Sequence, residues 1–215
     1  MLHRDYILRM IQQLSRVLAK ILKLKQEQQF DAALFEINAA GKKLLRLDIE
    51  MLADFDEENL IRTFHPAKNL DAMSCLITAE LLLAKVELEP YRNKKKDDLR
   101  KKALRLFLEA VTTLETLLTD GVMEKIFRLE KQLENSVLSE GTLRAQFRLR
   151  EYRADYGDAE NYLFRWANFG SSEALQEGEK FYWRLHRLSD TQLLSGGLPR
   201  EELDDGLADL RRLFE

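Results

Sequence analysis

The residues best suited to binding chemistry lie in one segment, TLRAQFRLREYR, residues 142–153. Arg144 and Arg148 are four positions apart, so on a helix they share one face. Each guanidinium is a planar fork that can hold a carboxylate through two hydrogen bonds. Glu151 and Tyr152 follow on the next turn. We predict a partner-binding surface made of Arg144, Arg148, Glu151 and Tyr152, with an ordinary solvated helix face as the alternative.

Residues that could support catalysis are not arranged in known motifs. The three histidines, His3, His65 and His186, have no ligand partner at helical spacing, and the motifs Glu-x-x-His and His-Glu-x-x-His are absent. The sequence has no glycine-rich phosphate loop and no Gly-x-Ser-x-Gly elbow. Cys75 lies among apolar residues and is expected to act as a small buried hydrophobe. We predict no catalytic residue, no metal ligand and no cofactor.

Three acidic clusters, at residues 56–58, 97–98 and 201–202, lie where helices are expected to begin. Negative charge there complements the exposed backbone N–H groups of the first helical turn. General acid–base catalysis needs two carboxylates held across a pocket, which a sequence cannot show. An enzyme with a carboxylate-lined site among the helices therefore stays an alternative.

The charge balance gives no global reason to bind nucleic acid, because the net charge is only -3. The basic run at residues 92–102 has few aromatic neighbours and is expected to be a solvated linker and helix start. Residues 1–25 hold six Lys and Arg residues against one acid, Asp5. This basic amphipathic segment could lie on an anionic membrane, but we expect its apolar face to pack on the following helix.

The secondary-structure elements that carry these residues are all predicted to be helices. Leucine dominates the apolar residues, β-branched residues are few, and only three prolines and nine glycines interrupt the chain. Apolar residues recur at steps of three and four. We expect helices at residues 5–28, 30–47, 69–89, 103–119, 120–135, 143–156, 158–169, 172–188 and 199–213, with short helical turns at 48–66. Asp120 is expected to cap one helix, and residues 189–199 to form a turn-rich link.

Several segments resemble the second helix of a tetratricopeptide repeat, in which an aromatic residue is followed by alanine three positions later. The matching sets are Phe30, Ala33, Ile37 and Ala40; Tyr156, Ala159 and Leu163; and Ala103, Phe107 and Ala110. In the second set Trp166 stands where the family prefers a small residue, and in the third Arg100 stands in the aromatic place. The three alanines are 70 and 56 residues apart, so the resemblance implies degenerate repeats with insertions. A bundle of unrelated helices would give some of these matches as well. The resemblance implies an all-α superhelix of stacked antiparallel hairpins, with residues 142–153 lining a concave, peptide-binding groove.

The small polar stretch at residues 136–142 suggests a boundary between an N-terminal helical subdomain, 1–135, and a tetratricopeptide-like subdomain, 136–215, which could also be one continuous domain. The first helix resembles the start of an uncharacterised bacterial family of helical proteins, at Asp5, Tyr6, Ile7, Arg9, Ile11, Leu18, Ala19 and Lys20. That resemblance implies a bacterial, cytoplasmic protein and no known activity.

The function expected from these features is that of a non-enzymatic interaction or scaffold protein, with a protein or peptide partner in a helical groove. A single cysteine fits a reducing cytoplasm, and no apolar run is long enough to span a membrane. The aromatic-dense region, residues 152–183, is expected to be mostly core, with any exposed surplus available for self-association. A membrane-surface adaptor acting through the first helix is the third hypothesis.

Overall fold

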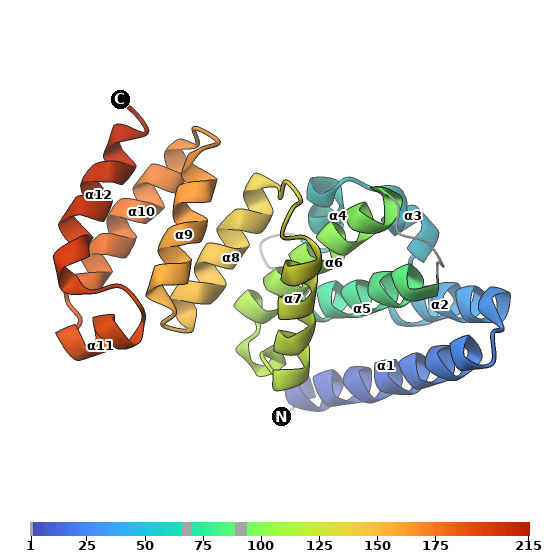
Figure 1. Ribbon diagram of the computed structural model, residues 1–215. Helices are drawn as coiled ribbons and strands as arrows, with labels where there is room; N and C mark the ends of the chain where they lie inside the picture. The colour runs from blue at the N-terminus through green and yellow to red at the C-terminus, as the bar shows by residue number, and fades with distance from the viewer. Residues whose placement is uncertain (1, 66–69, 89–93) are drawn as a thin grey trace. The chain divides into compact units, whose positions relative to one another are not determined.

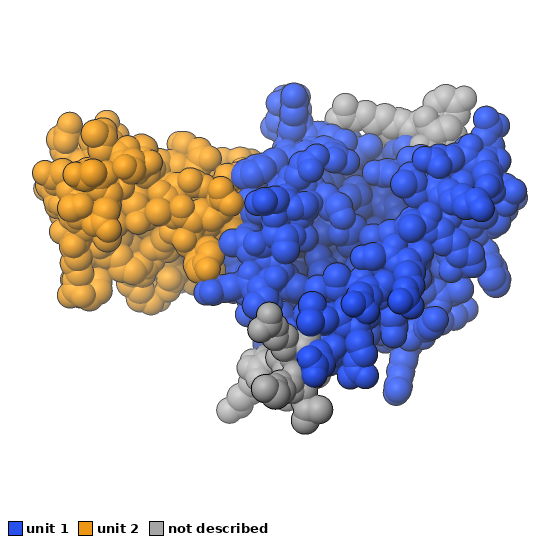
Figure 2. All heavy atoms as spheres, turned by 90° about the horizontal axis from the view of Figure 1, so that it is seen from below, with its two compact units in different colours: residues 1–137 blue, residues 138–215 orange. Residues whose placement is uncertain are grey.

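The computed structural model describes residues 2–65, 70–88 and 94–215. Within these residues the chain is all-α and contains no strand, which confirms the predicted fold class. Two compact units follow each other along the chain, unit 1 at residues 1–137 and unit 2 at 138–215 (Figure 2). The tetratricopeptide-like arrangement of the hairpins stays a prediction.

Unit 1 is a bundle around a central helix (Figure 1). Its helices are α1 (Leu2–Gln26), α2 (Phe30–Leu44), α3 (Ile49–Asp54), α4 (Glu57–Thr63), α5 (Ala72–Leu88), α6 (Lys94–Thr113), the 3-10 turn η1 (Glu115–Leu117) and α7 (Asp120–Gln132). The helices α1, α2, α3 and α6 all pack against α5. The expected ends of α5, at residues 69 and 89, lie outside the described residues.

The sequence of α5 explains its central place. A helix that is apolar on all sides must be covered on all sides, and all but four of the 17 residues of α5 are buried. The four that reach solvent are Ser74, Leu83, Ala84 and Glu87. Three of these four lie within one turn near the carboxyl end of the helix. This is the only stretch of α5 where unit 1 leaves an apolar surface open.

The helix α1 packs on α2 and α5 through one narrow row of side chains. Among residues 5–26, the fully buried ones are Ile7, Leu14 and Ile21, spaced seven apart. Its apolar face therefore packs inward, as expected, but the face is wider than the area that its neighbours cover. Leu8 and Leu22 stay half-exposed beside the buried row.

Unit 2 contains α8 (Glu140–Tyr152), α9 (Tyr156–Ala167), α10 (Ser172–Leu185), the short α11 (Asp190–Ser195), the 3-10 turn η2 (Arg200–Glu202) and α12 (Leu203–Arg212). The helices α8 and α9 form a closely packed hairpin, and α10 packs against both α9 and α12. The core is aromatic: Phe147 lies against Trp166 and edge-on to Phe181, which in turn packs edge-on to Tyr182. Of the nine aromatic residues at 152–183, however, only Trp166, Phe181 and Tyr182 are buried. Tyr152, Phe169 and Trp183 are exposed and the other three are intermediate, so the expectation that most of this region is core is wrong.

Four details differ from the sequence-based expectations. The cap of α7 is Thr119, whose side chain accepts a hydrogen bond from the Val122 N–H, and not Asp120. The segment predicted as a link at 189–199 contains α11, and the helix expected to reach Thr119 ends at Thr113. In the basic run, Lys102 is buried, and its ammonium donates a 2.8 Å hydrogen bond to the Ala53 carbonyl and pairs with Asp98. The part of that run before residue 94 lies outside the described residues.

Candidate functional site

The predicted site residues all lie on α8, and they already have partners within unit 2. Both oxygens of Glu173, on α10, accept hydrogen bonds from Arg144 Nη1, at 3.1 and 2.9 Å. Arg148 Nη2 lies 4.0 Å from the same carboxylate. Glu151 is held by the Arg184 fork at 2.7 and 2.9 Å. The structure thus brings the charged members of the predicted site together, facing α10.

This arrangement gives the predicted residues a structural role between α8 and α10. The pKa of the nearby Glu177 carboxyl is lowered, chiefly by a hydrogen bond from Lys180 and further by Arg184 and Arg148. Arginine and glutamate side chains thus face each other between α8 and α10. Tyr152 remains 55% exposed at the end of α8. Partner binding at Arg144, Arg148, Glu151 and Tyr152 stays a prediction, but a partner carboxylate would have to displace Glu173.

The residues that the sequence analysis considered as possible nucleophiles, acids or metal ligands lie in surroundings that suit structural roles. Burial raises the pKa of the Cys75 thiol, with Glu109 and Asp71 adding to the increase, so the reactive thiolate is disfavoured. Asp56 caps α4 by accepting a hydrogen bond from the Asn59 N–H, and this bond lowers the pKa of Asp56. Among the described residues, no three His, Cys, Asp or Glu side chains converge in a way that could hold a metal ion.

A groove in unit 1 offers an open apolar surface that the sequence did not reveal. It lies between α1, α5 and α7 and holds a cavity of about 180 Å³. We call it the α1/α5/α7 groove. Its lining residues are Leu18, Ile21, Leu22 and Lys25 of α1, Glu80, Leu83, Ala84 and Glu87 of α5, and Lys125 and Arg128 of α7.

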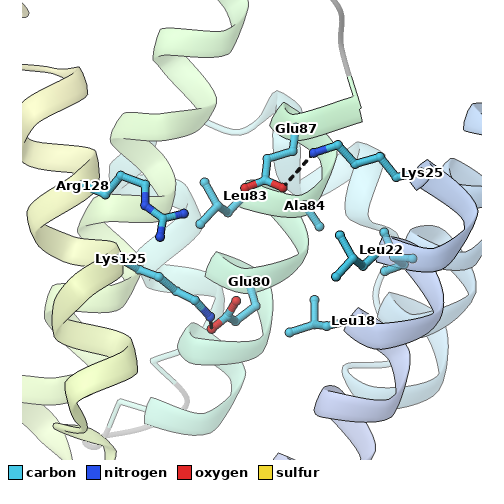
Figure 3. Close-up of a pocket in the computed structure, with 10 residues that line it drawn as sticks. Leu18, Leu22, Lys25, Glu80, Leu83, Ala84, Glu87, Lys125 and Arg128 are labelled. Carbon is cyan, nitrogen blue, oxygen red and sulfur yellow. Dashed lines mark hydrogen bonds and ion pairs between the residues drawn. The ribbon is translucent and has the colours of Figure 1, made fainter. Parts of the chain in front are cut away.

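The groove has an apolar interior and charged borders (Figure 3). Leu18 and Leu22 point from α1 toward α5, where Ala84 lies on the near side, and Leu83 lies on the side of α5 nearer to Arg128. Leu83 and Ala84 belong to the stretch where the central helix reaches solvent. Leu22 is 51% exposed, so this apolar surface is open. An apolar hollow with a few placed charges is typical of a binding site.

Two ion pairs tie α5 to the helices on either side. On one side, Lys25 Nζ lies 3.1 Å from Glu87 Oε2. On the other, Lys125 pairs with Glu80, whose side chain is only 9% exposed. A buried carboxylate without a cation would cost several kcal/mol of solvation, so Lys125 makes this charge tolerable at the groove wall. Arg128 extends beside it from α7 and pairs with the exposed Glu124 at 3.2 Å.

Two features of the sequence are weak signals for this groove, although neither identifies it. The segment AELLLAKVEL of α5, residues 79–88, is apolar except at Glu80, Lys85 and Glu87. The apolar residues of α1 also spread beyond the row of Ile7, Leu14 and Ile21, to Leu8, Leu18 and Leu22. Neither signal shows that α7 approaches both helices, because Glu80 and Lys125 are 45 residues apart in the sequence.

Comparison with known proteins places the chain at the level of a family. No curated protein and no solved structure matched. Among the described residues, no helix is long and apolar enough to cross a bilayer. A model described as "Family of unknown function (DUF6483)" matches residues 1–215. The chain therefore belongs to this family of unknown function, DUF6483.

Proposed function

We propose that this protein is a non-enzymatic interaction protein that binds a protein partner in the α1/α5/α7 groove. The observation that carries the proposal is the exposed turn of the central helix. Leu83 and Ala84 are partly exposed apolar residues of an otherwise largely enclosed helix, and half-exposed Leu22 faces the side of α5 that carries Ala84. Covering this surface would remove apolar area from water, which favours association.

The charges around the groove favour a protein partner over a small apolar molecule. The cavity is open on one side, and Lys25, Lys125 and Arg128 stand at its borders. Protein interfaces combine an apolar centre with a polar rim in this way. The groove therefore supports the interaction or scaffold role better than the α8 surface, whose arginines are engaged by Glu173.

Two further parts of the proposal rest on the sequence. We place the protein in the bacterial cytoplasm, on the resemblance of its opening residues and on its single cysteine, which is buried. We also keep degenerate tetratricopeptide-like hairpins as the proposed relation among its helices, supported by the close packing of α8 with α9 and of α1 with α2.

Site-specific photo-crosslinking tests the proposed function. A photoreactive residue replaces Leu22 in the groove, or Phe35, which is 74% exposed on α2 of the same unit and does not line the groove. We expect a crosslinked partner from position 22 and none from position 35. In the Ala84→Phe variant, which fills the cavity, the crosslink should disappear. Equal crosslinking at both positions, or a crosslink that survives Ala84→Phe, contradicts the proposal.

A further inference from the structure

The helix α1 repeats a three-residue unit every seven positions. The units are Ile-Leu-Arg at 7–9, Leu-Ser-Arg at 14–16 and Ile-Leu-Lys at 21–23. In each unit the first residue is buried, the second is exposed, and the third is an exposed cation. Because seven residues make nearly two helical turns, each member forms a row along the helix.

The second row extends the groove wall along α1. It starts at Leu22, which lines the cavity, and continues through Ser15 to Leu8, which is 49% exposed. No charged residue belongs to this row. An exposed row without charges, at a seven-residue spacing and with a small residue at its centre, resembles the contact row that one helix of a coiled coil presents to another. We call the row of Leu8, Ser15 and Leu22 the seam. The groove is thus suited to an α-helix lying along α1.

The third row sets the charge of that helix. Arg9, Arg16 and Lys23 border the seam on its solvent side, and Asp5 is the only acid in α1. Across the groove, α7 presents Lys125 and Arg128. Glu27 lies 3.8 Å from Lys23, and Arg9 donates a hydrogen bond to the Asp5 carbonyl. Arg16, at the centre of the row, has no ion-pair partner among the described residues.

A second copy of the chain would fit this surface poorly. Two α1 seams could pair antiparallel about Ser15, with Leu8 opposite Leu22 of the other copy. In that arrangement the same patch meets itself, so Arg16 would lie beside its own counterpart near the symmetry axis. Like charges in such positions oppose association. A helix that carries acids beside its apolar stripe meets no such repulsion.

We infer that the partner segment is an acidic amphipathic α-helix, which lays its apolar stripe on Leu8, Ser15 and Leu22 and its carboxylates beside Arg9, Arg16 and Lys23. This inference rests on the proposed function and adds the chemical class of the partner. Helix-in-groove recognition reads the partner's residues at steps of three, four and seven. The seven-residue spacing of the second row matches the spacing of apolar residues on such a helix. The cations of the third row favour a partner helix with negative charge.

The test uses the full chain and three labelled synthetic peptides in a fluorescence-anisotropy titration. The first is a heptad helix with leucine in its stripe and glutamate on its flanks. The second carries lysine in place of each glutamate, and the third has a central proline that breaks the helix. We expect the acidic helix to bind about tenfold tighter than the lysine helix and the broken helix, and to weaken as ionic strength rises.

Two matched variants locate the charge effect. Arg16→Glu should weaken the acidic peptide about fivefold and strengthen the lysine peptide. Lys43→Glu makes the same change on the exposed surface of α2 and should leave both affinities unchanged. Equal effects of the two variants would overturn the inference.

The remaining outcomes separate the inference from the proposed function. If the lysine helix binds as tightly as the acidic one, and Ala84→Phe abolishes both, the groove stands and the acidic partner is wrong. Specific helix recognition has affinities far tighter than millimolar. If no peptide binds at about millimolar concentration, both the acidic-helix inference and the groove as a helix-binding site fail. Binding to anionic vesicles that Arg16→Glu abolishes would assign the basic row to a membrane surface instead, and a dimer that dissociates in Leu22→Asp would assign the seam to a second copy.

Discussion

Lys125 of α7 forms an ion pair with Glu80 of α5, whose side chain is only 9% exposed, at the wall of the α1/α5/α7 groove. The pair joins two helices that are far apart in the sequence, and it places a carboxylate where the surroundings are largely apolar. Lys125 itself is about one-third exposed. The pair therefore both anchors α7 and fixes the charge at one side of the groove.

Removing the cation alone should be more harmful than removing both charges. We expect Lys125→Met to lower the free energy of unfolding by about 1–2 kcal/mol, because Glu80 is left buried without compensation. The double variant Lys125→Met/Glu80→Gln should recover most of that loss. Arg128→Met, which removes an exposed pair with Glu124, serves as the control and should change stability by less than about 0.5 kcal/mol. Denaturant unfolding measures all three, and a double variant no more stable than Lys125→Met would contradict this role.

The pairing of Arg144 with Glu173 allows the structural and binding roles of the predicted α8 surface to be separated. Arg144→Glu should cost about 1 kcal/mol or less in stability, since Glu173 is half-exposed. Swapping the charges in Arg144→Glu/Glu173→Arg should restore stability. If the surface also binds a partner carboxylate, Arg144→Glu should abolish partner crosslinking, and the swapped variant should not recover it. Full recovery of both properties would limit Arg144 to holding α8 against α10.

Glu160 should make the stability of unit 2 depend on pH. Its pKa is raised from the ordinary value of 4.5, mainly by burial and further by Glu202 and Asp209, although a 2.5 Å hydrogen bond from Tyr182 opposes the increase. Because the folded pKa exceeds the unfolded one, the stability that Glu160 contributes is present below about pH 4.5 and is lost as pH rises through the folded pKa.

The variant Glu160→Gln tests this sign, because glutamine keeps an acceptor for Tyr182 and never ionises. We expect its melting temperature to exceed that of the wild type at neutral pH, and the advantage to shrink toward pH 4. Glu201→Gln, at an exposed carboxyl of the same unit, is the matched control and should show no such trend. An advantage that is constant with pH would contradict the assignment.

Close backbone approach makes one glycine necessary. At Gly157 a Cβ atom would lie 2.6 Å from the Gly197 carbonyl oxygen, beside the hydrogen bond from the Gly157 N–H to the Gly196 carbonyl. Gly157→Ala should therefore destabilise the protein by about 1–3 kcal/mol, because backbone must move. Gly121 in α7 has no neighbour within 4 Å of the same position, so Gly121→Ala should be neutral or stabilising by up to about 1 kcal/mol. Thermal unfolding of both variants compares them, and a similar loss in each would contradict the packing argument.

Helices were predicted well from the sequence where apolar residues recur over a long segment. They were predicted less well where turn-forming residues such as Ser, Gly and Pro are frequent. The all-α class followed from leucine content and from apolar steps of three and four, which depend only on local geometry. The helix α11 was missed because Ser, Gly and Pro surround it. Its start does carry a signal, since Ser189 and Gln192 form a capping box at the head of SDTQ.

The candidate site could not be predicted in the same way, because it depends on contacts between distant segments. Spacing placed Arg144 and Arg148 on one face but could not show Glu173 opposite them. Likewise, Lys102 was expected in solvent, yet the Ala53 carbonyl accepts its hydrogen bond from another part of unit 1. The repeated units of α1 were visible in the sequence, but only the packing shows which row is buried and which remains open.

Backbone hydrogen exchange of the full chain, with and without the acidic helical peptide, tests the central claim most directly. We predict slowed exchange in α1, in the carboxyl-terminal half of α5 and in α7 around Lys125, with no change in α8 or α10. Protection centred on α8 and α10, or no protection anywhere at saturating peptide, would contradict the assignment of the groove as the binding site.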